Sequence, residues 1–337
     1  MSLDTTTVDD LGAAMPVSSA PSNPAPGSLI GRRVGRYRID ELLGGGMSEV
    51  YRAYDLENRR HVSLKRLPPD TAIEESARRR FKREAEAIAQ LEHPVIARFI
   101  EVFETPYDTW IAVELVEGIP LSQVLVDQGP LPPRRAATLV RRIAGGLAAA
   151  HAKSIVHRDL KTENIMVGPK DRVSILDFGL AKQLTRDDSG PTLTLEGMMV
   201  GTCRAMSPEQ ALAEDIDHRS DLFSLGVLLY ETLTGISPFA AKTPLQTVAM
   251  IISQPHVPIL EREPRVPPEM AELIEQLLAK DREHRPRHAG DVAAALRKFE
   301  ASPQGHAIPF SWWKAAGIVL TLLAVVLTGR CAVPGLA

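Results

Sequence analysis

Cysteine is scarce in this sequence, and its scarcity excludes two kinds of protein. The 337 residues contain only Cys203 and Cys331. Two cysteines so far apart cannot build a disulfide framework or, alone, a zinc site, so a reducing compartment is expected. An excess of charge of either sign is also lacking. Because the formal net charge is only -3, the chain has no electrostatic footprint for nucleic acid.

Long apolar runs are equally rare. The first residues are polar and acidic, without the apolar region of a signal peptide. An uncharged run from Ala315 to Gly329 follows two tryptophans and a lysine and precedes an arginine. With its flanks the run has about 18 to 20 residues, enough to span a bilayer, and its borders resemble interfacial anchors. We expect a transmembrane helix at 312–331; the alternative is a helix that docks on the globular part.

The remaining composition favours a folded protein with a polar N-terminal tail. Hydrophobic residues make up 44% and charged residues 24%, which supports a sizeable core and excludes wholesale disorder. Residues 1–30 are rich in Ser, Thr, Pro and Ala and show no hydrophobic period. We expect them to form a disordered tail, with a docking or phosphorylation role as the alternative.

A polar loop organises the rest of the chain. The run from His157 to Asn164 places an imidazole, a guanidinium, a carboxylate, an amine and an amide together. It follows an amphipathic helical pattern at Pro133–Ala152 and precedes a short apolar strand. So many polar groups cannot all be core residues, so some must face a site. Their order matches H-R-D-x-x-x-x-N.

A glycine-rich hairpin is expected near the start of the folded part. Alternating apolar residues around Tyr37–Leu43 and Val50–Tyr54 predict two strands joined by Gly44, Gly45 and Gly46. Glycine lets a backbone approach a phosphate closely and point N–H groups at it. The alternative is an ordinary flexible hairpin turn.

A lysine and a glutamate form the next candidate pair. In the predicted strand His61–Leu67, Lys65 lies on the face opposite Val62, and a buried unpaired ammonium is costly. The helical pattern at Glu74–Leu91 puts Glu84 on its apolar side, where a carboxylate needs a partner. We expect the two to pair, unless Lys65 is an exposed edge residue.

Two further patterns predict a connector and a metal ligand. The strands Phe99–Phe103 and Trp110–Val116 lead into an acidic, glycine-containing stretch at 114–118, whose backbone can bind an adenine edge. A later hairpin, Ile165–Leu176, ends in Asp177 and a glycine follows two residues on. A carboxylate just past an apolar strand is a metal-ligand position; the alternative is a turn cap.

A long irregular segment separates this hairpin from the predicted helices. Residues 180–207 are polar, and such segments inside compact domains are usually functional. The stretch Asp221–Leu229 is apolar nearly all round and predicts a buried helix. Further helical patterns occur at Gln246–Ile252, Pro268–Ala279 and Ala289–Phe299.

In this order and spacing, the motifs resemble the protein kinases, specifically the eukaryotic-like Ser/Thr kinases of bacteria, over roughly residues 36–299. The resemblance implies an α+β, two-lobed fold in a kinase domain at 31–300. The expected parts are a β-rich N-lobe with one key helix (31–113), a hinge (114–118), a mainly helical C-lobe (119–300), a linker (301–311), the transmembrane helix (312–331) and a short tail (332–337).

The resemblance also assigns roles to the polar residues. Asp159 would accept or orient the substrate hydroxyl proton, and Lys161 would neutralise the transferring phosphoryl group. Asn164 and Asp177 would hold Mg²⁺, with Mn²⁺ as a substitute. Lys65, fixed by Glu84, would hold the phosphates of ATP. The remaining nucleotide contacts would come from Leu43, Gly44, Gly45, Gly46, Val50, Glu114 and Val116.

Regulation and fold support follow from the same resemblance. Arg158 beside the catalytic Asp implies activation by phosphorylation of segment 180–207, with Thr194 and then Thr192 as the expected sites. Glu209 and Arg285 resemble the buried structural ion pair of the family. The departures are a glycine loop one residue short unless Leu43 takes the first position, Ser48 for a third glycine, Thr162 for a proline and Ala205 for a tyrosine.

The expected function is therefore transfer of the ATP γ-phosphate to Ser/Thr hydroxyls of proteins, with autophosphorylation, in trans within a homodimer, at a membrane. The expected location is the cell membrane, single-pass, with the kinase domain in the cytoplasm and no nucleic-acid partner. The alternatives are a membrane-anchored pseudokinase that acts as a scaffold and a small-molecule kinase. The retained charged residues argue against the first, and the long segment ending at Glu209 argues against the second.

Overall fold

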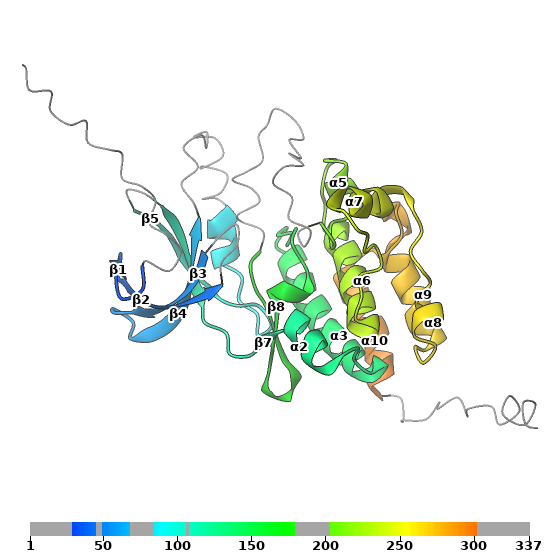
Figure 1. Cartoon of the computed structure of the whole chain (residues 1–337), viewed down its shortest axis with the longest axis horizontal. Helices are drawn as coiled ribbons and strands as arrows, with labels where there is room; N and C mark the ends of the chain where they lie inside the picture. Colours follow the sequence, from blue (N-terminus) through cyan, green and yellow to red (C-terminus); the bar gives the residue numbers. More distant parts are fainter. Residues whose placement is uncertain (1–28, 45–48, 68–83, 106–107, 179–202, 302–337) are drawn as a thin grey trace, which may run out of the picture. The chain divides into compact units, whose positions relative to one another are not determined.

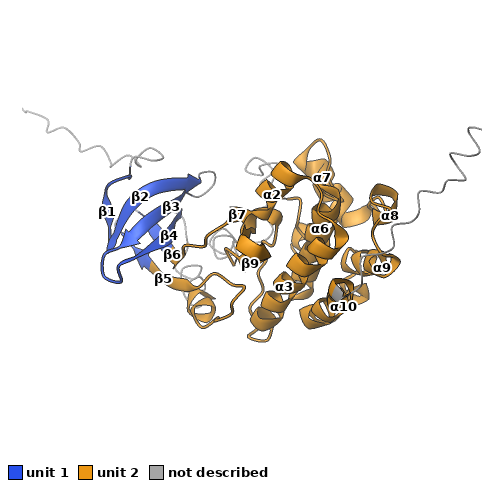
Figure 2. Ribbon diagram, turned by 90° about the horizontal axis from the view of Figure 1, so that it is seen from below, with its two compact units in different colours: residues 1–69, 103–111 blue, residues 70–102, 112–337 orange. Residues whose placement is uncertain are grey.

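The computed structural model describes residues 29–44, 49–67, 84–105, 108–178 and 203–301 of the chain (Figure 1). The chain divides into two compact units (Figure 2), residues 1–69 with 103–111, and residues 70–102 with 112–337. The first unit is built on strands and the second mainly on helices. The α+β composition expected from the motifs, with strands in one unit and mainly helices in the other, is confirmed.

A six-stranded sheet with the order β1-β2-β3-β4-β6-β5 holds the first unit together. The neighbours β1 to β4 pair antiparallel. The two strands of the expected hairpin are confirmed, because Gly44 at the end of β2 lies opposite Val50 near the start of β3. The turn between them, residues 45–48, lies outside the described residues. Its strands are β1 (Arg33–Val34), β2 (Tyr37–Gly44), β3 (Glu49–Asp55), β4 (Arg60–Leu67), β5 (Phe99–Glu104) and β6 (Thr109–Glu114).

Aromatic side chains form the core of this sheet. Tyr37 stacks on Phe103 with 5.4 Å between ring centroids, and Phe103 stacks on Trp110 at 6.3 Å. Tyr51 lies 6.0 Å from the same tryptophan. Tyr37, Tyr51 and Trp110 are all buried. Because aromatic rings bury large areas, these contacts fix one face of the sheet.

The second unit is mainly helical, and α6 lies at its centre. In Figure 1, α6 lies between α3 and α9, and contacts to both helices agree with that view. The longer helices are α2 (Leu121–Gln128), α3 (Pro133–His151), α6 (Arg219–Thr234), α7 (Pro244–Ser253), α9 (Pro268–Leu277) and α10 (Ala289–Ala301). The shorter elements are a helical stretch at 84–89, β7 (Ile119–Pro120), η1 (Thr162–Asn164), β8 (Ile165–Gly168), η2 (Pro169–Asp171), β9 (Arg172–Ile175), α5 (Pro208–Ala211), α8 (Ile259–Arg262) and η4 (Arg282–His284).

Helix α6 is buried on nearly every side, as its sequence predicts. Leu222, Phe223 and Leu229 are fully buried. Gly226 lets α9 approach closely, since a Cβ atom at this position would lie 2.7 Å from Cβ of Leu277. A helix that is apolar all round needs such neighbours on each face, because exposure of any face to water would cost free energy.

The hairpin of β8 and β9 packs on α3. Ile165 lies opposite Ile175 in the antiparallel pair, and a Cβ atom on Gly146 of α3 would come within 2.9 Å of the Ile175 side chain. Ile175 also forms a parallel bridge to Ile96. Packing on both sides therefore fixes the hairpin that leads to Asp177 in its position on the helix.

Most predicted elements are confirmed within the described residues. The strands at 99–103 and 110–116 and the helices near 133–152, 221–229, 246–252, 268–279 and 289–299 all occur, with small shifts at their ends. Helix α2 was not predicted, because only Leu121 and Val124 of its residues are buried and its apolar pattern is short. Of the helix expected at 74–91, residues 84–89 are helical and 68–83 lie outside the described residues.

The expected tail and membrane helix are not tested. Residues 1–28, which hold nearly all of the predicted tail, and residues 312–331 lie outside the described part of the chain. Within the residues that the structure describes, no helix combines the length and apolar character needed to cross a membrane.

Candidate active site

The backbone of the catalytic loop, residues 157–164, is held by a buried carboxylate of α6. Asp221 accepts hydrogen bonds from the backbone N–H groups of His157, at 2.8 Å, and of Arg158, at 2.9 Å. His151, at the end of α3, lies 2.7 Å from the same carboxylate. Burial alone would raise the pKa of Asp221, but His151 and the N–H donors hold it below its usual value. The carboxylate therefore stays charged and fixes the start of the loop.

His157 ties this loop to the segment that carries Asp177. Its Nε2 atom lies 2.9 Å from the carbonyl oxygen of Leu176, and its ring lies 4.6 Å from that of Phe178. Its Nδ1 atom accepts the backbone N–H of Asp159 at 3.3 Å. A carbonyl only accepts, so the ring proton must sit on Nε2. Burial lowers the pKa of His157, so the ring is neutral and serves as a structural link.

The three central polar residues of the loop meet around one carboxylate. The Nζ atom of Lys161 lies 3.2 Å from Oδ2 of Asp159. The side-chain amide of Asn164 donates to the backbone oxygen of Asp159 at 2.8 Å and to its Oδ2 atom at 3.1 Å. Asp159 and Lys161 are both mostly buried. The three residues thus lie in contact with one another, and the site that they are predicted to form, with its chemical roles, stays a prediction.

Asn164 and Asp177 are brought close by the β8–β9 hairpin. The backbone N–H of Leu176 donates to the carbonyl oxygen of Asn164 at 2.8 Å, one residue before Asp177. Because the amide nitrogen of Asn164 donates to Asp159, the side-chain oxygen of Asn164 is the atom that could serve as a metal ligand. An amide oxygen and a carboxylate are ligands that the hard cation Mg²⁺ prefers. The residues present therefore fit the metal that the resemblance implies.

Arg158 has a protein partner in this structure. Its guanidinium lies 3.7 Å from the carboxylate of Glu84, and both side chains are partly exposed. The expected partners of Arg158, phosphorylated Thr194 or Thr192, lie outside the described residues. Glu84 itself was expected to pair with Lys65. These two residues belong to different units, and that pairing stays a prediction.

The nucleotide-contact residues of the first unit lie on its hairpin and on β4. Val50 of β3 is directly opposite Lys65 of β4, and Lys65 is half-buried. Leu43 is exposed and Gly44 ends β2. Gly45 and Gly46 lie outside the described residues, so the question of which residue takes the first glycine position stays open.

The expected hinge begins where β6 ends. Glu114 is the last residue of β6, and its backbone N–H donates to the carbonyl oxygen of Arg98 at 2.8 Å. Val116 follows in irregular backbone and is partly buried. Adenine contacts from Glu114 would therefore come from its carbonyl oxygen, because its N–H is already paired.

An acidic pair that the sequence did not predict lies beside the loop. Glu231 of α6 is next to Glu163, and Thr162 lies within 3.5 Å of its carboxylate. Burial, and then the charge of Glu163, raises the pKa of Glu231 to about 7, although Arg204 opposes the shift. A glutamate inside an otherwise apolar helical pattern was the only signal in the sequence, and it did not reveal the neighbour 68 residues earlier.

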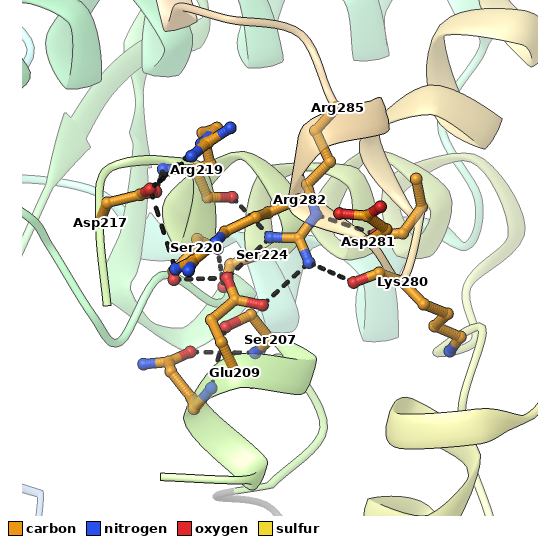
Figure 3. A network of polar contacts seen from close by, with 12 residues as sticks. Ser207, Glu209, Asp217, Arg219, Ser220, Ser224, Lys280, Asp281, Arg282 and Arg285 are labelled. Carbon is orange, nitrogen blue, oxygen red and sulfur yellow. Dashed lines mark hydrogen bonds and ion pairs between the residues drawn. The ribbon is translucent and has the colours of Figure 1, made fainter. Parts of the chain in front are cut away.

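The predicted ion pair between Glu209 and Arg285 is confirmed (Figure 3). The guanidinium contacts both carboxylate oxygens, at 2.7 and 2.9 Å, and both side chains are buried. Its other N–H groups donate to the carbonyl oxygens of Ala279, Arg219 and Lys280. All five donors of this arginine are thereby used. Ser220 adds a hydrogen bond to Glu209 at 2.6 Å.

A second residue that the sequence analysis missed is Gln210, which follows Glu209 in α5. Ser207 caps this short helix through its hydroxyl, and the Gln210 side chain completes the capping box. The same side chain reaches the catalytic loop, where it donates to the carbonyl oxygen of Arg158 at 2.8 Å. Its position in the sequence indicates a helix cap and gives no sign of this second bond.

Comparison with known proteins agrees with this geometry. Residues 37–295 match the family model of the protein kinase domain. The chain is 38% identical over 266 residues to the serine/threonine-protein kinase PknB of Mycolicibacterium smegmatis, with 77% of this chain and 42% of that protein covered. It is 37% identical over 273 residues to the serine/threonine-protein kinase pkn3 of Myxococcus xanthus, with 79% and 50% covered. The chain thus spans half or less of the length of these relatives.

Solved structures also resemble this chain. The crystal structure of the Mycobacterium tuberculosis PknI kinase domain is similar to this chain with a TM-score of 0.64 and 26% sequence identity. The similarity covers 80% of this chain and 98% of that one.

Proposed function

Because this chain belongs to the protein kinase family, we propose that it is a serine/threonine protein kinase that transfers the γ-phosphate of ATP to Ser/Thr hydroxyls of proteins. The observation that carries the proposal is the cluster of Lys161 and Asn164 around the Asp159 carboxylate. A scaffold that only binds partners has no physical need for a base, a cation and an amide gathered in this way.

The roles of these residues follow from the charge that phosphoryl transfer develops. Negative charge spreads over the phosphoryl oxygens, so positioned cations and hydrogen-bond donors lower the barrier most. Asp159 would orient the acceptor hydroxyl and take its proton, while Lys161 would neutralise the transferring group. Their short mutual distance keeps both within reach of one reacting centre.

ATP and a divalent cation are the expected ligands of this site. Asn164 and Asp177 would hold Mg²⁺, with Mn²⁺ as a substitute, and the cation would neutralise the phosphates when bound. Lys65 with Glu84, the hairpin residues 43–46 and Val50 would bind the phosphates, while Glu114 and Val116 would meet the adenine.

Membrane attachment and regulation complete the proposal. The segment 312–331 would anchor the kinase domain at the cytoplasmic side of the cell membrane, and autophosphorylation in trans at Thr194 or Thr192 would recruit Arg158. Removal of residues 310–337 is expected to shift the protein from the membrane to the soluble fraction of lysed cells. Unchanged partitioning would refute the anchor without touching the kinase assignment.

The central test is Asp159→Asn, which keeps the shape of the side chain but removes the base. We expect phosphate transfer from radiolabelled ATP to the protein itself and to a basic acceptor protein to fall by at least ~100-fold, because general-base catalysis contributes this much. Asp127→Asn, an exposed change on α2, is the matched control and should leave transfer unaltered. Full transfer by the Asp159 variant would defeat the assignment.

A further inference from the structure

The side-chain amide of Gln210 links two backbone segments of the second unit. Its oxygen accepts the backbone N–H of Ser207 at 3.0 Å, and its nitrogen donates to the backbone oxygen of Arg158 at 2.8 Å. One end of the amide therefore closes the cap of α5, while the other end reaches the catalytic loop. Both ends are used, so the side chain has one favoured orientation.

The residue that Gln210 contacts has an unusual backbone. Arg158 has a φ of 65°, in the left-handed region that side chains other than glycine rarely adopt. Such a conformation persists only where the surroundings hold it. Here the N–H of Arg158 is held by Asp221, at 2.9 Å, and its carbonyl oxygen by Gln210. The strained residue is thus fixed at both of its peptide groups.

The carbonyl oxygen of Arg158 also belongs to the peptide plane that leads into Asp159. Since a peptide unit is planar, an atom held at one edge of the plane fixes the rotation of the whole unit. The opposite edge, the N–H of Asp159, is held by Nδ1 of His157 at 3.3 Å. Gln210 and His157 therefore hydrogen-bond to the two sides of the same peptide plane, which immediately precedes the Cα atom of Asp159.

We propose that Gln210 is a positioning residue for phosphoryl transfer, which sets the direction of the Asp159 carboxylate by holding the peptide plane before it. This inference rests on the proposed role of Asp159. A carboxylate must sit at hydrogen-bond distance from the acceptor hydroxyl, and a misplacement of 1 Å can cost about 100-fold in rate. Gln210 acts through this geometry and not through contact with the reacting atoms.

The alternative is a purely structural role, in which Gln210 only caps α5. The two roles separate because the two ends of the amide have opposite hydrogen-bond character. Gln210→Glu keeps an oxygen for the Ser207 N–H but replaces the donor that faces the Arg158 oxygen. Ser207→Ala weakens only the cap, since it removes the hydroxyl that accepts the backbone N–H of Gln210 at 3.3 Å and leaves the Gln210 side-chain amide in place.

The experiment compares steady-state kinetics of the full chain and its variants with ATP and a basic acceptor protein. For Gln210→Glu we expect kcat to fall ~10-fold or more while KM for ATP changes less than ~2-fold, because the nucleotide contacts are untouched. A carboxyl group regains a donor when it is protonated, so the deficit should shrink as the pH is lowered from 8 to 6. Gln210→Met, which has no donor at any pH, should show the loss without this recovery.

Two controls fix the interpretation. Gln276→Glu adds the same charge at an exposed position of α9 and should match the wild type. Ser207→Ala should keep kcat within ~2-fold, because the bond to Arg158 remains. Equal losses in Ser207→Ala and both Gln210 variants, or a kcat within ~2-fold for both Gln210 variants, would overturn the inference.

Failure of the inference is distinguishable from failure of the proposed function. If Asp159→Asn is inactive and the Gln210 variants are fully active, only the positioning role is wrong. If Asp159→Asn is active, the proposed function itself is wrong. Thermal unfolding of each variant shows which losses come from unfolding; should Gln210→Glu not fold, Gln210→Met decides the kcat test.

Discussion

Glu209 and Glu231 are two carboxylates of the helical unit that are shielded from solvent. The pKa of Glu209 is lowered from its ordinary value, whereas that of Glu231 is raised. Burial alone would raise both. Arg285 and Ser220 override it at Glu209 and lower its pKa to about 2, whereas the nearby charge of Glu163 adds to burial at Glu231 and raises its pKa to about 7. The partner, and not the depth of burial, decides whether a carboxylate stabilises the fold.

The difference separates a structural site from a site available for chemistry. Around Glu209 every donor of Arg285 is satisfied, so this region can change little without loss of stability. Beside the catalytic loop, the charge of Glu163 and burial raise the pKa of Glu231, and the charge of Arg204 opposes this effect only in part. A carboxyl group whose pKa is raised in this way destabilises the fold when it is charged, and such groups are typical of functional sites.

The largest expected effect comes from Arg285→Met, which leaves Glu209 buried without its countercharge. We expect the free energy of unfolding to fall by about 3 to 5 kcal/mol, as for other broken buried pairs. Urea denaturation followed by the helical circular dichroism signal measures the loss. Arg265→Met removes an exposed arginine paired with Glu263 and should leave the unfolding midpoint unchanged. Similar midpoints for both variants would mean that the buried pair is not special.

Acid should weaken the Glu209 pair next. Because the folded pKa is lowered from 4.5 to about 2, the pair contributes full stability above about pH 5, and that contribution is lost as the pH falls toward 2. We expect a loss of about 2 kcal/mol between pH 6 and pH 3. Urea denaturation of wild type and Glu209→Gln across this range isolates it, since their difference in stability should shrink with acid. A constant difference would contradict the lowered pKa.

Glu231→Gln should act in the opposite direction. Its folded pKa lies above the usual 4.5, so the charged form destabilises the fold and stability falls as the pH rises through about 7. The variant should therefore gain about 1 to 2 kcal/mol at pH 8, after allowance for partial exposure, and little at pH 5. Thermal unfolding at both pH values measures the gain. A variant that is less stable at pH 8 would show that Arg204 or Thr162 compensates the charge.

The smallest effect is expected for Ser220→Ala, which removes one donor from Glu209 and keeps the ion pair. A single hydrogen bond to a charged group predicts a loss of about 1 to 2 kcal/mol. Ser253→Ala, an exposed hydroxyl at the end of α7, is the matched control for the same chemical change. A loss as large as that of Arg285→Met would mean that the serine, and not the arginine, keeps Glu209 charged.

The sequence predicted local elements and motif positions well. The hairpins, the buried helix α6 and the pair of Glu209 with Arg285 follow from periodicity, turn residues and motif order. In β4 the same alternation placed Lys65 opposite Val62 and Leu64, and those two are buried as expected. Such patterns are readable because they depend on neighbours a few residues away.

Long-range polar partners were not predictable in this way. Arg66 lies on the buried face of β4, where Glu49 at 2.8 Å and Asp108 at 2.9 Å compensate its charge. Periodicity indicates that Arg66 is buried but not which carboxylates meet it. Gln210 is the same case, because its cap role is local and visible while its bond to Arg158 crosses 52 residues.

Both ring nitrogens of His157 are engaged in hydrogen bonds, and this has a consequence for the pH dependence of the reaction rate. One nitrogen gives its hydrogen to a main-chain oxygen and the other receives an amide hydrogen, so this imidazole has no lone pair to lend to a reacting hydroxyl. An inflection near neutrality in the turnover of this protein therefore cannot be assigned to the histidine of the loop. It must come from another group of the protein, from the nucleotide or from the acceptor itself.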